Sequence, residues 1–314
     1  MEYRVLGNTG LKVSRLCFGA LTIGPLQANL PLQSGAAVIR AALDAGVNFI
    51  DTAELYGTYP YIKAACGSAD NVVVASKSYA YTYEDMRRSV EEACRAIGRD
   101  YIDIFLLHEQ PSRLTLAGHA DALAYLSDAK RQGTIRAAGV STHTVEVARA
   151  AAAMAEIDVI HPLFNMRGIG IMDGTAADMA AAVAAAAAAG KGVYTMKALG
   201  GGHLIKDAAA AISWVLDAAG VSAVAVGMQS ADEVAFNCAI FAGDRPGSEL
   251  AARLAGRTRR LLVEDWCAGC GRCAEKCPAG ALRLSDGRAA VDPARCLCCG
   301  YCGAWCPEFC LKII

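Results

Sequence analysis

The sequence predicts an α/β fold: a closed barrel of eight parallel strands, followed by a small cysteine-rich domain. Two observations carry this prediction. Strand-like apolar runs alternate eight times with helical segments in the first three quarters of the chain, and 10 of the 14 cysteines fall in the last 48 residues. Strand-helix alternation is typical of a parallel sheet, and eight such units indicate a (β/α)8 barrel of the TIM type. The uneven distribution of cysteines indicates a second domain with its own chemistry.

The expected barrel strands are short apolar runs separated by turn residues and helices. They cover 16–19, 47–50, 72–76, 102–107, 135–140, 157–160, 192–196 and 222–226. An amphipathic helix is expected over 83–97, where Met86, Val90 and Ile97 share one face. A hairpin over 3–13 is expected to close the lower end of the barrel. The structural rival is an open doubly wound sheet, but no G-x-G-x-x-G loop follows the first strand.

Composition argues against several classes of protein. The 314 residues include 30 basic and 31 acidic side chains, for a net charge of -1 at pH 7. Such a balance does not attract nucleic acid or an anionic membrane surface. The most apolar stretch, 180–189, is nine alanines and one valine, too short to span a bilayer. With no secretory leader and no prenylation box recognised, we expect a cytoplasmic chain that binds neither nucleic acid nor membrane.

The pattern of strands and helices breaks near residue 245. We therefore expect a barrel domain over 1–245, a linker helix over 246–264 and a cysteine-rich domain over 265–314. Four arginines follow the break, at 253, 257, 259 and 260. They form either a solvated helix face or a docking surface for an acidic electron-transfer partner.

Eight cysteines form two copies of the motif C-x2-C-x2-C-x3-C-P. The copies are Cys267, Cys270, Cys273 and Cys277, and Cys296, Cys299, Cys302 and Cys306. In this spacing three thiolates hold one iron-sulfur cluster, while the fourth reaches another cluster. Structural zinc is the alternative, because paired C-x2-C units also form zinc ribbons. Cys298 and Cys310 lie outside the motifs and are expected to be buried or incidental thiols.

The segment from about 265 to 314 resembles the bacterial two-cluster ferredoxins, and it matches their cysteine motifs residue by residue. The resemblance implies an α+β ferredoxin-like domain with two [4Fe-4S] clusters. It assigns one cluster to Cys267, Cys270, Cys273 and Cys306, and the other to Cys296, Cys299, Cys302 and Cys277.

Polar residues stand at the carboxyl ends of several expected strands, where barrel enzymes carry their working groups. They are Asp51, Lys77, His108, Ser141 and Lys197, and Tyr56 lies five residues beyond Asp51. These residues belong to segments that together resemble the aldo-keto reductase family from Tyr3 to about Asn237. The segments are 49–57, 75–78, 100–108, 139–141 and 227–237.

The resemblance implies a catalytic tetrad of Asp51, Tyr56, Lys77 and His108. Reduction of a carbonyl by hydride leaves an alkoxide that needs a proton, and a free phenol with a pKa of about 10 is a reluctant donor near neutrality. We therefore expect Lys77 to lower the pKa of Tyr56 and Asp51 to hold Lys77 charged. His108 is expected to orient the substrate carbonyl.

The resemblance also implies a nicotinamide cofactor, NADP or NAD. Ser141 and Asn165 stand where the family holds the nicotinamide amide, and Lys197 with the glycines at 200–202 is expected near the pyrophosphate, a tight turn being the alternative for the glycines. The expected phosphate and adenine contacts are Gly227, Gln229, Ser230, Glu233 and Asn237. Three departures concern this cofactor: His161 stands for a glutamine, Met196 for a stacking aromatic ring, and no basic residue selects NADP at 229–233.

Two functions remain open. In the first, the chain is an NAD(P)H-dependent reductase of a small ketone or aldehyde, with the ferredoxin-like domain as a structural or docking unit. In the second, it is an electron-transfer protein, working with a redox partner, whose barrel is a binding platform or uses another cofactor. The tetrad favours the first function, whereas His161 and Met196 favour the second. Hydride donors pass two electrons at once, whereas each [4Fe-4S] cluster exchanges one.

Overall fold

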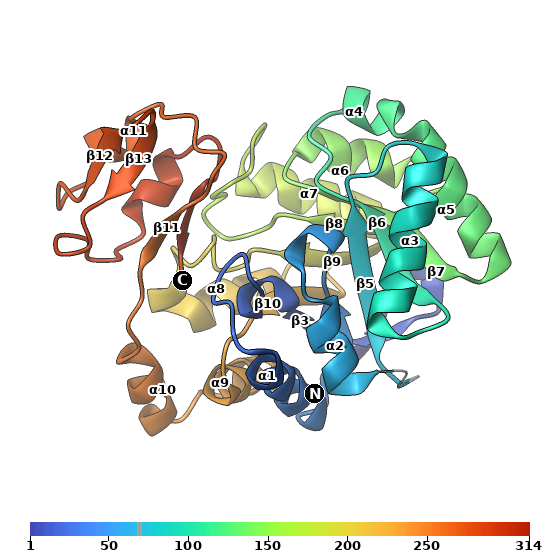
Figure 1. The fold of residues 1–314 in the computed structure, drawn as a ribbon, viewed down its shortest axis with the longest axis horizontal. Coiled ribbons are helices and arrows are strands. Elements are labelled where there is room, and N and C mark those ends of the chain that lie inside the picture. Colours follow the sequence, from blue (N-terminus) through green and yellow to red (C-terminus); the bar gives the residue numbers. More distant parts are fainter. Residues whose placement is uncertain (68, 70) are drawn as a thin grey trace.

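The computed structural model describes residues 1–67, 69 and 71–314. Eight parallel strands form a closed barrel, in which the last strand pairs with both the first and the seventh (Figure 1). The strands are β3 (Leu16–Gly19), β4 (Phe49–Asp51), β5 (Val73–Ser78), β6 (Ile102–Leu107), β7 (Ile135–Thr142), β8 (Val159–Pro162), β9 (Gly192–Met196) and β10 (Ala223–Gly227). The predicted (β/α)8 barrel is therefore confirmed.

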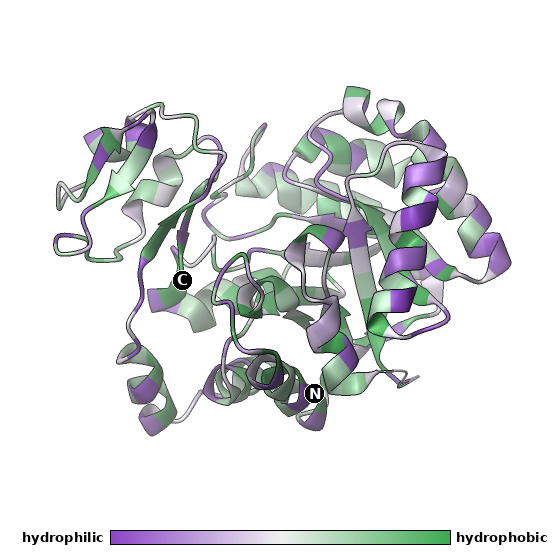
Figure 2. Cartoon of the chain, viewed as in Figure 1, coloured by the Kyte–Doolittle hydropathy of each residue, from purple (hydrophilic) through white to green (hydrophobic). Residues whose placement is uncertain are grey.

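Helices surround the barrel and bury their apolar faces against it. They are α1 (Leu32–Asp44), α2 (Tyr59–Cys66), α3 (Tyr83–Ile97), α4 (Arg113–Gly118), α5 (Ala120–Gln132), α6 (Val145–Ala152), α7 (Ala176–Ala188), α8 (Ala208–Leu216) and α9 (Ala231–Phe241). Helix α3 begins where the Thr82 side chain accepts a hydrogen bond from the Asp85 N–H, and it ends at the left-handed Gly98. Figure 2 shows hydrophilic residues on the outward sides of α3 and α5. Among the residues described, no helix is both long and apolar enough to cross a bilayer.

A hairpin closes the amino-terminal end of the barrel. Strands β1 (Tyr3–Val5) and β2 (Lys12–Ser14) pair antiparallel, and the turn between them packs on the start of β9. Leu6 and Leu11 are buried in the cluster that fills the barrel, together with Phe49 and Tyr194. The open end is therefore the carboxyl end of the strands, where the candidate site lies.

The chain after the barrel forms a small module with two antiparallel strand pairs. Its elements are α10 (Ser248–Ala255), β11 (Leu261–Val263), α11 (Arg272–Glu275), β12 (Leu282–Ser285), β13 (Arg288–Val291) and β14 (Leu311–Ile313). Strand β11 pairs with β14, and β12 with β13. The segment expected to be a linker helix thus contains both α10 and strand β11.

The module lies beside the barrel, with the end of the chain on the side that faces it (Figure 1). The contact is made by the loop between β9 and α8. The Ile313 N–H donates a hydrogen bond of 2.9 Å to the Gly201 carbonyl, and His203 Nε2 lies 2.9 Å from the Leu311 carbonyl oxygen. This loop joins the module to the open end of the barrel.

Candidate active site and cysteine cavities

The four residues expected to form a tetrad come together at the open end of the barrel. Asp51 ends β4, Lys77 lies in β5, His108 follows β6, and Tyr56 ends a 3-10 turn (Glu54–Tyr56). Lys77 Nζ donates to both Asp51 oxygens, at 2.8 and 2.9 Å, and to the Thr52 carbonyl at 2.7 Å. The same nitrogen lies 5.0 Å from the centre of the Tyr56 ring, and the Tyr56 and His108 rings meet edge to face at 5.6 Å.

A buried hydrogen-bond network fixes the Asp51 carboxylate below this site. The Tyr194 hydroxyl donates to Asp51 Oδ1 at 2.9 Å, and His161 Nε2 lies 3.6 Å from the same oxygen. Burial raises the pKa of Asp51, but the charges of Lys77 and His161 together lower it by more, so its pKa lies below the ordinary value. Asp51 is therefore ionised at neutral pH and holds Lys77 in place.

The pKa of Tyr56 differs from the expectation. Burial raises it well above its usual value, and the carboxylates of Asp51 and Glu109 raise it further. The reason is that Asp51 sits within 2.8 Å of Lys77 and neutralises the ammonium that was expected to lower this pKa. Tyr56 therefore keeps its proton at neutral pH and is placed to donate it.

His108 is held as a neutral ring. Burial, followed by the charge of Lys77, lowers its pKa to about 3. The Tyr79 ring stacks on it at 4.3 Å, and the Tyr79 hydroxyl donates to Glu109 at 2.6 Å. His108 Nδ1 is buried without a hydrogen-bond partner in the described part of the chain. A neutral imidazole with an unused ring nitrogen suits contact with a carbonyl group.

A second polar cluster adjoins the tetrad, and the sequence did not point to most of it. His143 Nε2 lies 3.0 Å from Glu109 Oε1 and 2.7 Å from Lys197 Nζ. Burial lowers the pKa of His143 to about 4 and that of Lys197 to about 8. A signal was present in the strand period, because His143 and Tyr79 each lie two residues beyond an expected site residue and so share its face.

The cysteines of the module surround two cavities. One is lined by Cys267, Cys270, Cys273 and Cys306, together with Cys310. The other is lined by Cys277, Cys296, Cys299 and Cys302, together with Cys298. Each cavity thus takes three cysteines from one motif and the fourth from the other, which is the combination that the ferredoxin resemblance implies.

The geometry of these thiols bears on the choice between a cluster and zinc. Leaving aside positions 68 and 70, which are not described, no three His, Cys, Asp or Glu side chains converge as ligands of a single ion. Thiols around a cavity suit a cluster with iron at four corners better than one tetrahedral zinc. Of the two extra thiols, Cys310 Sγ lies 3.3 Å from Cys306 Sγ, and burial raises its pKa. Both extra thiols line the cavities and are not incidental surface groups.

Comparison with known proteins now decides the family. The profile of the aldo/keto reductase family matches residues 15–209, more than half of the chain, and that of the 4Fe-4S dicluster domain matches residues 261–307. The chain belongs to the aldo/keto reductase family. Its module is a 4Fe-4S ferredoxin-type domain, so the fusion predicted from the sequence is confirmed.

Several relatives share parts of this arrangement. Aldo-keto reductase YhdN of Bacillus subtilis is 31% identical over 183 residues, which are 53% of this chain and 54% of that protein. L-galactose dehydrogenase of Arabidopsis thaliana is 29% identical over 154 residues, 45% of this chain and 48% of that protein. The chain thus matches about half the length of these curated relatives. The structure of PA4992 from Pseudomonas aeruginosa, 29% identical, aligns over 77% of this chain and 94% of that one with a TM-score of 0.66.

The module has a relative of its own. It is a component of the ion-translocating oxidoreductase complex of Methanosarcina acetivorans, 36% identical over 58 residues, which are 18% of this chain and 22% of that protein.

The residues expected to hold the nicotinamide amide are not presented to a ligand. Ser141 and Asn165 are completely buried. Ser141 Oγ accepts a hydrogen bond from the Glu109 N–H, and the Asn165 side chain bonds the backbone of Arg167 and Ile169. Because these polar groups are used within the reductase barrel, their expected role does not fit this structure.

The stacking position also differs from the expectation. His161 is 1% exposed, and its ring stacks at 3.9 Å on Tyr194, which comes two residues before Met196. This aromatic pair lies inside the barrel, next to Asp51, and supports the tetrad from below. The sequence did not single out Tyr194, because its hydroxyl reaches Asp51 only once the barrel has closed.

The glycines after β9 do not form an open phosphate loop. A Cβ atom at Gly201 would lie 3.0 Å from side-chain atoms of Phe309 and Lys312, and one at Gly202 would lie 2.2 Å from the Ile313 oxygen. Lys197 Nζ lies 4.8 Å from the centre of the Phe309 ring. The place expected for a pyrophosphate is therefore filled by the end of this chain.

The expected phosphate and adenine contacts after β10 are engaged as well. Arg257 bonds Ser230 Oγ at 3.2 Å and forms an ion pair with Glu233. Glu233 also accepts the Gln229 N–H at 2.6 Å, and its carbonyl accepts from the Asn237 side chain at 2.8 Å. A Cβ atom at Gly227 would meet the Thr22 side chain at 2.1 Å. These residues form a closed junction with the segment that leads to the module.

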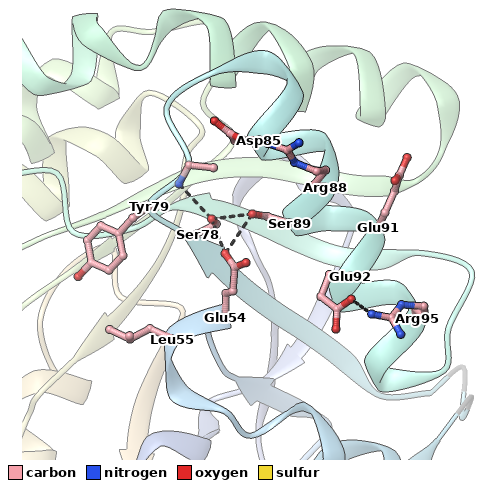
Figure 3. A pocket seen from close by; sticks show the side chains of 11 residues that line it. Glu54, Leu55, Ser78, Tyr79, Asp85, Arg88, Ser89, Glu91, Glu92 and Arg95 are labelled. Carbon is pink, nitrogen blue, oxygen red and sulfur yellow. Dashed lines mark hydrogen bonds and ion pairs between the residues drawn. The ribbon is translucent and has the colours of Figure 1, made fainter.

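A surface groove of about 750 Å³ lies on the outside of the barrel, between the end of β5 and α3 (Figure 3). In it Glu54 points toward two hydroxyl groups, accepting from Ser78 at 2.6 Å and from Ser89 at 3.0 Å. Tyr79 lines the groove and also stacks on His108. The other tetrad residues do not line it, so the groove is a neighbour of the site.

Proposed function

We propose that this oxidoreductase interconverts a small ketone or aldehyde and the corresponding alcohol at the open end of its barrel. The observation that carries the proposal is the buried Asp51–Lys77 pair beside Tyr56 and His108. This grouping contains a proton donor, a charged pair that stabilises the donor's conjugate base, and a neutral ring that contacts the carbonyl. It contains no activated nucleophile, so a covalent intermediate is not required.

Tyr56 supplies the proton. Its raised pKa keeps the phenol protonated, and the alkoxide that develops on the substrate is a much stronger base than a phenolate. As the proton leaves, negative charge grows on Tyr56 near Lys77. A cation 5.0 Å from the ring centre stabilises such a charge by about 3 kcal/mol at an effective dielectric of about 20.

His108 orients the carbonyl, and the residues around it keep it in position. Stacking on Tyr79 fixes the plane of the ring, and burial keeps the ring neutral. A neutral ring donates a hydrogen bond to the carbonyl without competing with Tyr56 for the proton transfer.

The hydride of NADPH or NADH is the first candidate source of electrons, because the family resemblance implies it. When bound, a nicotinamide would supply hydride to the carbonyl carbon. In this structure Ser141, Asn165 and the loop after β9 do not fit a dinucleotide, since their polar groups and space are already used. We therefore derive no step through it.

The second candidate is electron transfer through the module, favoured by the two cysteine cavities beside the barrel. We propose one [4Fe-4S] cluster in each cavity, four motif cysteines to a cluster, with a redox partner protein outside. Such clusters supply one-electron chemistry when bound. Iron and sulfide analysis of anaerobically purified protein should find about eight of each per chain. Zinc with little sulfide would contradict the assignment.

The carbonyl reaction is tested on the same anaerobic holoprotein. A panel of aldehydes and ketones is incubated with NADPH, with NADH or with dithionite-reduced methyl viologen, and the products are identified by mass spectrometry. We expect alcohol from at least one carbonyl with at least one reductant, and none from a Lys77→Met variant that retains its iron. If the wild type makes no alcohol with any reductant, the carbonyl proposal fails.

A further inference from the structure

The last residues of the chain enter the open end of the barrel. We define residues 309–314 as the C-terminal tail. Phe309 is only 4% exposed, and its side chain belongs to an apolar cluster with Leu163, Ile169 and Leu204, which come from loops of the barrel. The edge of the His143 ring meets it at 6.0 Å. An aromatic side chain of the module is thus inserted among barrel loops beside the tetrad.

Three glycines make room for the tail. A Cβ atom at Gly170 would lie 2.7 Å from the Phe309 ring, and Gly201 and Gly202 face Phe309, Lys312 and Ile313 at 3.0 Å or less. All three glycines have positive φ, which other residues adopt with strain. The loop after β9 thus fits a backbone that approaches closely, and the Ile313–Gly201 hydrogen bond shows which backbone that is.

The tail also brings a buried cation to this place. Lys312 is 7% exposed, its Nζ lies 3.2 Å from the centre of the Phe309 ring, and it donates a hydrogen bond to the Phe309 carbonyl. Phe309 therefore lies between two ammonium groups, those of Lys312 and Lys197. Such cation-π contacts strengthen when they are desolvated, so they favour the docked tail.

A second segment closes the far end of the same path. Arg257 pairs with Glu233 and Ser230, and Arg253 of α10 pairs with Asp232 at 3.0 Å. The tail and Arg257 thus cover two separate stretches of the chain, after β9 and after β10. The resemblance assigned these same stretches to the pyrophosphate and the adenosine of a dinucleotide.

We infer that the C-terminal tail and Arg257 occupy the dinucleotide path of this reductase barrel, so that the holoprotein with its tail docked binds neither NADPH nor NADH. The loop after β9 is then a docking site for the protein's own module. This inference concerns binding, and it holds whether or not the barrel reduces carbonyls.

The test is a titration of NADPH and NADH into anaerobic holoprotein, followed by calorimetry. Two variants release the tail: Phe309→Ala combined with Arg257→Ala, and a chain that ends at Cys310 and keeps every cysteine. Leu284→Ala, at an exposed position of the module, is the matched control. We expect no binding up to about 1 mM for the wild type and the control. We expect at least tenfold tighter binding of one nucleotide in a tail variant.

Two outcomes overturn the inference. Binding to the wild type at micromolar concentration shows that the docked tail leaves the path open. Absence of binding in every tail variant shows that the tail is not what excludes the nucleotide. Absorbance and spin resonance verify the clusters in each protein. Hydrogen exchange on the wild type adds a test that needs no variant, because protection of amides 200–203 by NADPH would also contradict the inference.

Discussion

Replacing Asp51 by asparagine tests how the tetrad is held together. The side chains of Lys77 and Asp51 are 1% and 7% exposed, and their charged atoms are 2.8 Å apart. Coulomb's law at an effective dielectric of about 20 gives about 6 kcal/mol for this pair. Breaking a buried pair by removing one partner costs about 3 to 5 kcal/mol, because the other charge stays buried without compensation. We expect Asp51→Asn to lower the free energy of unfolding by that amount.

The assay is urea unfolding of the anaerobic holoprotein, followed by circular dichroism. Asp232→Asn is the matched control, since Asp232 pairs with Arg253 at the surface and such pairs contribute less than about 1 kcal/mol. In the double variant Asp51→Asn with Lys77→Met, part of the loss should be recovered, because no charge is left unpaired. A loss below about 1 kcal/mol in Asp51→Asn would refute the reasoning.

The pH dependence of this loss has a definite sign. The pKa of Asp51 is lowered in the folded state, so its contribution to stability is present above the ordinary carboxyl pKa and disappears as the pH falls through the lower, folded value. The difference between wild type and Asp51→Asn should therefore be constant from pH 5 to pH 8. A difference that grows steadily across that range would place the titration elsewhere.

Three further predictions follow from other parts of the structure. Cys277→Ser should disturb the cluster of Cys296, Cys299 and Cys302 in spin resonance, and disturbance of the other cluster alone would mean that the pairing is wrong. Since burial and Lys77 lower the pKa of His108 to about 3, kcat/KM should show no ionisation of His108 between pH 5 and 8, and a step near pH 6.5 that disappears in His108→Gln would contradict this. Gly139→Ala should destabilise the barrel by at least about 1 to 3 kcal/mol, because its Cβ would lie 2.1 Å from the Val159 oxygen, whereas Gly118→Ala, with open space around it, should not.

The barrel could be predicted from the sequence because each strand is a short apolar run with clear ends. The expected bounds of β3, β6, β9 and α3 agree with the structure. The expected ends of β7 fell short, since Ser141 and Thr142 are polar and yet extend the strand inside the barrel. Burial of polar residues at a functional edge is not visible in hydropathy.

The candidate site was predictable where a residue's position on a strand decides its place. Strand ends converge at one rim of a barrel, so Asp51, Lys77 and His108 were expected to be neighbours. The contact of Tyr194 with Asp51 joins residues 143 positions apart, and nothing local indicates it. The glycines at 200–202 were ambiguous because positive-φ loops accommodate an anion or another backbone equally well, and only the structure shows the tail against them.

The central claim is that Tyr56 donates the proton in a carbonyl reduction, and Tyr56→Phe tests it most directly. The measurement is kcat/KM for the carbonyl that the wild type reduces, with equal cluster content in all proteins. Tyr61→Phe is the control, because its hydroxyl bonds the Leu30 carbonyl away from the tetrad. We predict a decrease of roughly 10²- to 10⁴-fold for Tyr56→Phe and little change for Tyr61→Phe. An unchanged rate in Tyr56→Phe would contradict the claim.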